Sequence, residues 1–293
     1  MRTIGRAEQG VRHDAAPPDH PTGPARRERP ARRPPPGPRR VGPATGTPVV
    51  LCPGAGTSRW LGFGAGVVDE LGVRLISLDR PGLGSSDPDP GRTLTSWAAD
   101  VAALGLDGPR VVGFSQGAPF ALACAFVPGV RRVAVVSGAD EVATMTGVLP
   151  GHFRELVETV AADPAAAEKF FSSLTPDALW DMIVPNSPAV DREIYEQPDF
   201  ARAYRRAMTE AFAQGPAGYA RDSVLAMSPW PFPLAEVPVP VDLWYGDLDL
   251  HHSPDQGFTL SRRIRGARRR LIPGAGGSLL WTHAEPILRT LLE

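Results

Sequence analysis

The chain has 293 residues, which is enough for one large α/β domain with an insertion or for two small domains. Hydrophobic residues make up 42% and charged residues 22%, as in ordinary globular proteins, and 31 basic residues nearly balance 32 acidic ones. Because no net field would attract nucleic acid or an anionic membrane, we expect neither as a partner.

No apolar run approaches the roughly 18 residues that a membrane span needs, and the arginine-rich N-terminus lacks the apolar stretch of an export signal. The two cysteines, Cys52 and Cys124, lack the spacing of a metal site and fit a reducing compartment. We therefore expect a cytoplasmic protein without a metal or other cofactor, whose partner is a small-molecule substrate. The sequence leaves its oligomeric state open.

Residues 1–45 differ in composition from the rest of the chain. They contain ten prolines and ten arginines, with few aliphatic residues and no periodicity. Such a segment buries too little apolar surface to offset the entropy of ordering it. We expect a disordered tail over 1–45, followed by one domain over 46–293.

From residue 47 onward, short β-rich runs alternate with helical stretches. We expect strands at residues 48–52, 73–78, 110–114, 132–136, 241–245 and 270–272. We expect helices at residues 60–71, 93–104, 116–127, 255–265 and 278–292. Apolar strands that alternate with helices predict an α/β fold with a doubly wound, mostly parallel sheet.

The interval between the strands at 132–136 and 241–245 contains only helical signals. Prolines punctuate it, as at helix starts and loops, and we expect helices at 151–161, 164–174, 199–214 and 217–227. We interpret residues 139–238 as a helical lid over a site, not as a second independent domain. Its aromatic residues fit an apolar pocket, although core packing explains such residues equally well.

The motif Gly113-Phe114-Ser115-Gln116-Gly117 directly follows a predicted strand and opens an apolar helix. This order is typical of a nucleophile elbow, in which a sharp turn lifts the serine hydroxyl above the sheet. The flanking glycines allow a close backbone approach that a Cβ would block. The start of the helix offers the backbone N–H of Gln116 to a developing oxyanion. We expect Ser115 to be a nucleophile.

From about residue 47 to its end, the chain resembles the α/β-hydrolase superfamily. Residues 51–56 (LCPGAG) stand where that family has a His-Gly loop, and the resemblance makes the backbone N–H of Ala55 the second oxyanion donor. Residues 79–86 (DRPGLGSS) resemble a family turn with a structural role, so neither Arg80 nor Ser85 is given a catalytic role. A serine in the elbow argues against haloalkane dehalogenation, which needs a carboxylate there.

The resemblance also implies a triad acid. Residues 245–249 (YGDLD) match the family's Gly-x-x-Asp turn, which places the acid at Asp249. Such a carboxylate orients the histidine and stabilises its imidazolium. Asp247 is the rival within the same turn, and Asp140 stands at a position that some relatives use.

The chain departs from the family where the catalytic histidine should stand. After the last strand the sequence reads PGAGGS over residues 273–278, and Gly277 occupies the histidine position. Two of the six histidines, His13 and His20, lie in the expected tail, and His152 lies in the expected lid. None of these three is a candidate base.

Three histidines remain near the expected site. His283 lies six residues past position 277, about 9 Å along the final helix, and we interpret it as a surface or packing residue. His251 and His252 follow Asp249 at the carboxyl-end rim of the sheet, where ligands bind in α/β proteins. His252 is the favoured substitute base, against a purely structural role for the same side chain.

A second departure lies at the front of the domain. The family begins with an antiparallel hairpin, and residues 1–45 contain nothing that resembles it. We therefore expect a sheet truncated at one edge, with an exposed strand or the tail covering it.

The leading hypothesis is a serine hydrolase that cleaves an ester or related acyl bond through an acyl-enzyme on Ser115. One alternative is a catalytically impaired relative that keeps the pocket to bind a small ligand. Another is cofactor-free, non-hydrolytic chemistry that uses the oxyanion hole without acylation. Losing the base costs a serine protease about 10⁶ in kcat, so a useful hydrolase needs a replacement for the missing histidine.

Overall fold

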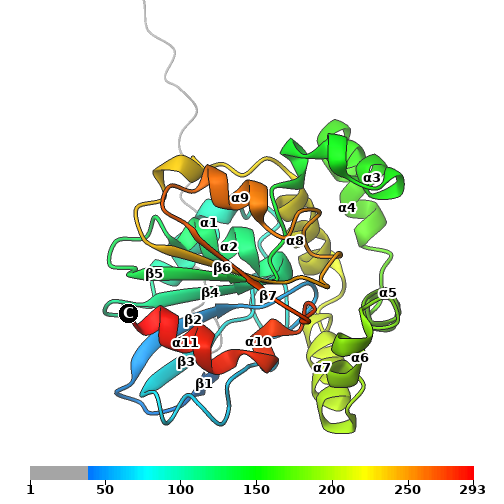
Figure 1. The fold of residues 1–293 in the computed structure, drawn as a ribbon. Coiled ribbons are helices and arrows are strands. Elements are labelled where there is room, and N and C mark those ends of the chain that lie inside the picture. The colour runs from blue at the N-terminus through cyan, green and yellow to red at the C-terminus, as the bar shows by residue number, and fades with distance from the viewer. Residues whose placement is uncertain (1–38) are drawn as a thin grey trace, which may run out of the picture. The chain divides into compact units, whose positions relative to one another are not determined.

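The computed structural model describes residues 39–293, which contain a seven-stranded sheet (Figure 1). The strand order is β1-β3-β2-β4-β5-β6-β7. The strands are β1 (Arg39–Val41), β2 (Thr47–Cys52), β3 (Val73–Ser77), β4 (Arg110–Phe114), β5 (Arg132–Val136), β6 (Val241–Gly246) and β7 (Arg268–Ile272). Strands β2 to β7 run parallel, and β1 alone is antiparallel to its neighbour β3. The doubly wound, mostly parallel sheet is confirmed.

Helices cover both faces of this sheet because the central strands are apolar on both sides. On one face, Val111 and Val133 pack with α1 (Leu94–Ala102), α2 (Ala118–Cys124) and α9 (Phe258–Arg263). On the other face, Val112 and Ala134 pack with α10 (Leu279–Thr282) and α11 (Ala284–Leu292). Successive strand residues therefore enter opposite cores, as the period of two requires.

The front edge of the sheet differs from the expected one. Arg39–Val41, assigned to the tail from sequence, forms β1 and pairs with Leu75 to Ser77 of β3. The expected tail boundary at residue 45 is therefore wrong, since residues 39–45 supply this strand and its connection to β2. Where the family has a two-stranded hairpin, residues 39–293 supply one short antiparallel strand. The rest of the expected tail, residues 1–38, lies outside the described residues.

Two helix predictions are also corrected. Residues 60–71 form successive turns without a helix, because Gly62, Gly64 and Gly66 weaken a helix and Gly64 adopts φ +69°. The last helix is broken into α10 and α11 at His283. Both pieces still bury their apolar side chains against the sheet.

The interval between β5 and β6 is helical, as the sequence indicates. It contains α3 (Gly151–Ala162), α4 (Pro164–Phe171), α5 (Pro176–Ile183), α6 (Ala189–Tyr195), α7 (Pro198–Ala211) and α8 (Ala217–Met227). Helices α5 and α6 were not predicted. Figure 1 shows the six helices gathered at one end of the sheet. Their shared core takes in Leu61 and Leu83 from the loops after β2 and β3, so the insertion packs on the sheet's loops. Within the described part of the chain, no helix is long and apolar enough to cross a membrane.

A buried cluster of charges joins the insertion to two of these loops. Asp222 of α8 is fully buried and accepts hydrogen bonds from Arg80 (2.7 Å) and from Arg92. Arg80 also donates to the carbonyl oxygens of Pro53 (2.6 Å) and Gly54 (3.0 Å). One carboxylate thus pairs with two buried guanidinium groups, and Arg80 holds the loop that follows β2.

We expect Asp222→Asn to destabilise the fold by about 3–5 kcal/mol, because it leaves two buried arginines without a counter-charge. Urea unfolding measures this loss. Asp199→Asn is the matched control, since Asp199 pairs with Arg202 on the surface of α7 and such pairs contribute little. Equal stability of the two variants would contradict the prediction.

Candidate active site

Ser115 stands in a strained turn between β4 and α2. Its φ is +52°, in the left-handed region that non-glycine residues rarely adopt. A Cβ on Gly117 would lie 2.1 Å from the carbonyl oxygen of Cys52, and a Cβ on Gly113 would lie 2.7 Å from that of Gly117. Both flanking positions therefore require glycine, and the predicted elbow geometry is present. A single 3-10 turn, Ser115–Gly117, precedes α2.

The loop after β2 passes directly beside Ser115. A Cβ built on Gly54 would lie 3.4 Å from the Cβ of Ser115, and Ala55 follows immediately. The two hydrogen bonds from Arg80 to the carbonyl groups of Pro53 and Gly54 fix this loop. Ala55 and Gln116 thus stand on the two segments that meet at Ser115. The Gln116 side chain points elsewhere, because its Nε2 donates to Ser223 of α8 at 3.1 Å.

The two aspartates of the turn after β6 have different partners. Asp249 is 2% exposed and accepts the backbone N–H groups of His251 and His252, each at 3.2 Å. Asp247 instead accepts the N–H of Gly274 at 2.7 Å, which ties the turn to the loop after β7. The geometry gives Asp247 a structural contact and directs Asp249 towards a histidine.

His252 lies against Asp249 and fills the space beside Gly277. Its Nδ1 is 2.9 and 3.0 Å from the two carboxylate oxygens of Asp249. A Cβ on Gly277 would come within 2.6 Å of the His252 ring and 3.2 Å of Asp249 Oδ2. Cβ atoms do not approach this closely, so the imidazole occupies the place that a side chain at position 277 would need.

Sequence reasoning missed a second carboxylate at this point. Asp191 of α6 is 2% exposed and accepts the backbone N–H groups of Gly277 (2.7 Å) and Ser278 (2.8 Å). A Cβ on Gly276 would lie 2.2 Å from its Oδ2. The Gly276-Gly277 pair was the only available signal, since each glycine makes room for a side chain from another segment.

The aromatic ring of Phe114 connects the two halves of the site. Phe114 precedes Ser115, its ring centroid is 5.8 Å from that of His252, and its ring also borders Gly54. Among the hydrogen bonds of residues 39–293, none joins the Ser115 hydroxyl to His252. Catalytic hydrogen bonds are often long without substrate and tighten in the complex.

The remaining histidines have other surroundings. His251 is exposed, and of its groups only the backbone N–H contacts Asp249. His152 is exposed on α3, and His283 contacts the hydroxyl of the adjacent Thr282 at the break between α10 and α11. His13 and His20 lie outside the described residues. His252 is thus the imidazole in contact with the candidate acid.

Charges around His252 favour its protonated form. Burial lowers the pKa of His252, but the charge and hydrogen bond of Asp249 and the charge of Asp191 raise it above its ordinary value. For Asp249, burial raises the pKa, but the charge and hydrogen bonds of His252 bring it below its ordinary value. The pair can therefore take up a proton and stabilise it, as a general base requires.

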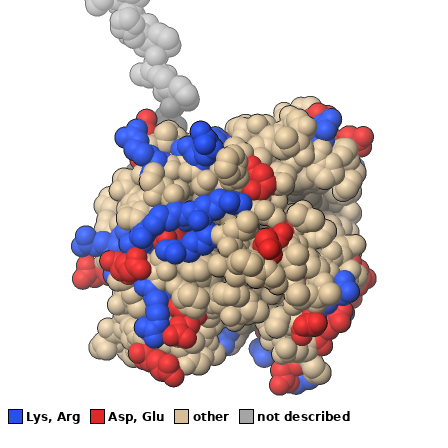
Figure 2. Space-filling view, viewed as in Figure 1, with Lys and Arg blue, Asp and Glu red and all other residues tan. Residues whose placement is uncertain are grey.

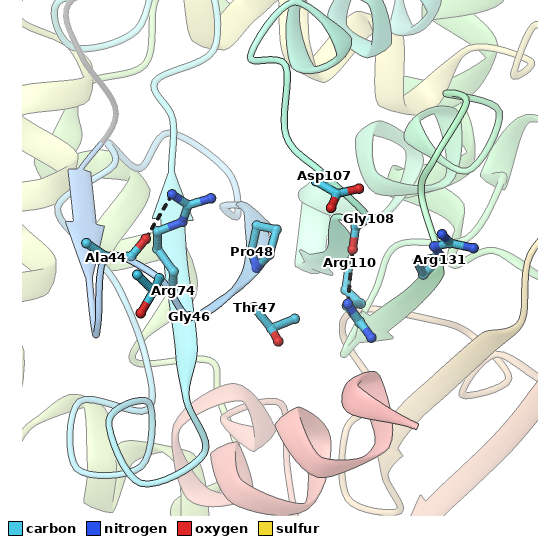
Figure 3. A pocket seen from close by; sticks show the side chains of 10 residues that line it. Ala44, Gly46, Thr47, Pro48, Arg74, Asp107, Gly108, Arg110 and Arg131 are labelled. Atoms are coloured by element: carbon cyan, nitrogen blue, oxygen red, sulfur yellow. Dashed lines mark hydrogen bonds between the residues drawn. The ribbon is translucent and has the colours of Figure 1, made fainter.

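Other surface features lie away from Ser115. A pocket of about 520 Å³ lies at the amino ends of β2 and β4, opposite the elbow, and is lined by Arg74, Arg110 and Arg131 (Figure 3). The side chains of Arg74 and Arg110 donate to backbone carbonyls around it, and Figure 3 shows them pointing apart. Figure 2 shows a belt of basic side chains on the face over β7, which begins with Arg268, Arg269 and Arg270. Neither feature includes a candidate catalytic residue.

Asp140, the third candidate acid, sits on the far side of the His252 loop. The pKa of its carboxyl is raised to about 6, mainly by burial. The hydrogen bond from Ser253 and the charge of Arg263 lower this pKa, and the charge of Asp255 raises it. Ser253 donates its hydroxyl to Asp140 and accepts the N–H of Gly257 at 2.8 Å. Asp140 thus anchors the loop and does not contact a histidine.

We expect Asp140→Asn to stabilise the protein at pH 7.5 but not at pH 4. A raised pKa means that the folded state prefers the protonated carboxyl, so stability present below pH 4 is lost as the pH rises through about 6. The shift corresponds to about 3 kcal/mol, and asparagine keeps an acceptor for Ser253. Chemical denaturation of both proteins at the two pH values tests this. A stability difference that does not change with pH would refute it.

Comparison with known proteins agrees with this fold. The family model described as the alpha/beta hydrolase family matches residues 49–289, and the chain belongs to that family. A search of curated proteins found no significant match. Similar solved structures include a bromoperoxidase from Bacillus anthracis (23% identity, TM-score 0.64) and an enol-lactonase from Burkholderia xenovorans LB400 (20%, 0.63). Each comparison covers 87% of this chain and 94% of the other. An esterase from Exiguobacterium antarcticum (19%, 0.59) covers 87% and 93%. At these identities the likeness shows the fold alone.

Proposed function

We propose that this protein is a serine hydrolase that cleaves an ester or related acyl bond of a small, apolar molecule. Ser115 is the nucleophile, His252 the general base and Asp249 the acid that orients it. The backbone N–H groups of Ala55 and Gln116 form the oxyanion hole. The helical insertion over residues 139–238 acts as the lid, and we retain the expectation of a cytoplasmic location.

The reaction follows from the hydrogen bonds of His252. Since Nδ1 faces Asp249, it carries the hydrogen, and Nε2 is left to accept the Ser115 proton as Oγ attacks the acyl carbon. The two backbone donors hold the oxyanion of the tetrahedral intermediate. His252 then protonates the leaving alcohol, and the same base activates a water that hydrolyses the acyl-enzyme.

One observation carries this proposal: the His252 ring stands where a side chain at position 277 would begin, already bonded to Asp249. The family histidine has thus been replaced in space by one from the loop after β6. The surroundings of the loop after β2 are evidence for an apolar substrate, because its Gly56 packs against Leu179, Phe212 and Tyr219 of the insertion.

We expect a fluorophosphonate to label Ser115 and small activated esters to be hydrolysed. Ser115→Ala should abolish both, and His252→Ala should lower kcat by about 10⁶-fold, as loss of the base does in serine proteases. Peptide mapping of the adduct and ester turnover are the measurements. His283→Ala is the matched control and should retain full activity. A His252→Ala rate equal to that of the native chain would refute the base, and label on another residue would refute the nucleophile.

We expect Gly277→Ala to lower kcat by more than about 10²-fold although it adds only a methyl group. That methyl would overlap the His252 ring, and a displacement of about 1 Å in a catalytic group has this effect. Gly66→Ala is the matched control, since its Cβ meets nothing within 4 Å. The double variant Gly277→His with His252→Ala has a histidine at the family position and none at position 252. It should recover turnover that is lost in His252→Ala. Full activity of Gly277→Ala would contradict the proposed position of the base.

A further inference from the structure

The lid and the loop after β7 meet at a single carboxylate. Asp191 of α6 accepts two consecutive backbone N–H groups, those of Gly277 and Ser278, which lie 86 and 87 residues further along the chain. Both its oxygens are used, and the side chain is almost completely buried. Burying a carboxylate is costly unless it is hydrogen-bonded, and these two backbone donors satisfy both of its oxygens.

The same short loop separates Asp191 from His252. The absent Cβ of Gly276 leaves room for Asp191, and the absent Cβ of Gly277 leaves room for His252. The two side chains therefore lie against adjacent residues of the same loop, Asp191 against Gly276 and His252 against Gly277. Asp249, in the turn after β6, contacts the His252 ring directly. His252 is therefore influenced by two carboxylates, that of Asp249 and that of Asp191 in the insertion.

Helix α6 is held rigidly at this position. Tyr195, on the turn after Asp191, is buried and packs edge-on against Trp281 of α10 at 5.9 Å between ring centroids. Burial raises the pKa of the Tyr195 hydroxyl, and the charges of Tyr204, Asp191 and Asp249 raise it further. This phenol therefore stays neutral and adds no negative charge to that of the two carboxylates.

We propose that Asp191 is a positioning residue for the base: it fixes residues 276–278 against the lid and places a second negative charge behind His252. This inference rests on the proposed function. In consequence, the base is complete only while α6 is docked, and opening of the lid withdraws a charge that supports the imidazolium. Asp191 touches neither the nucleophile nor the oxyanion loop, so it acts through His252 alone.

The charge is tested with Asp191→Asn, which keeps one acceptor oxygen and removes the negative charge. The expected result is a lower His252 pKa, because the charge that stabilised the imidazolium has been removed, and a shift of the acid limb of kcat/KM to lower pH by the same interval. The measurements are an NMR titration of the imidazole and a pH–rate profile with an activated ester. Asp199→Asn, on the exposed surface of α7, is the control and should move neither.

A second variant keeps the charge and disturbs its position. In Gly276→Ala the new methyl would lie 2.2 Å from Asp191 Oδ2, so the carboxylate must move away. We expect kcat to fall with KM little changed, and the His252 pKa to fall as in Asp191→Asn. A His252 pKa that is unchanged in both folded variants overturns the proposal. The imidazole titration does not depend on turnover, so failure of Ser115 labelling would refute the proposed function separately.

Discussion

Two adjacent positions without side chains determine the arrangement of this site. Gly276 and Gly277 let Asp191 and His252 approach the loop after β7 from opposite sides, and a Cβ at either position would overlap them. Close-packed interiors do not absorb such overlaps, because neighbouring atoms have no free volume into which to move. Gly277 therefore leaves space that the His252 ring occupies.

The site depends on buried charges that are paired across long sequence intervals. Asp222 pairs with Arg80 and Arg92, and Arg80 in turn fixes the carbonyl groups of the loop that carries Ala55. A buried ion pair of this kind adds little net stability, but removing one member is costly. Its effect here is geometric, since Arg80 holds the carbonyl groups of Pro53 and Gly54 in the loop that passes beside Ser115.

The insertion between β5 and β6 contributes to both halves of the site. Asp222 of α8 pairs with Arg80, which holds the loop beside Ser115, and Asp191 of α6 holds the loop beside His252. These helices also share a core with Leu61 and Leu83, so apolar packing and polar contacts both hold the insertion against the loops after β2 and β3. A segment that covers a site and also completes it couples substrate entry to the catalytic geometry.

Local sequence patterns determined the sheet and the elbow. Apolar runs such as residues 110–114 indicate buried parallel strands, and the glycines around Ser115 indicate a turn in which backbone segments approach closely. The same approach failed for β1, whose Arg-Arg-Val sequence becomes a strand only because β3 offers it an edge. It also failed at residues 60–71, where three glycines outweighed a helical pattern.

Tertiary structure alone decided which charged groups meet. His252 could be selected from sequence by its nearness to Asp249, but its position against Gly277 depends on contacts between two loops 25 residues apart. Asp191 and Asp222 carried no local signal, because their partners lie 86 and 142 residues away in the chain. Periodicity and propensity report how each segment buries its apolar surface. Pairing of buried charges is a property of the folded arrangement, in which desolvation makes each contact specific.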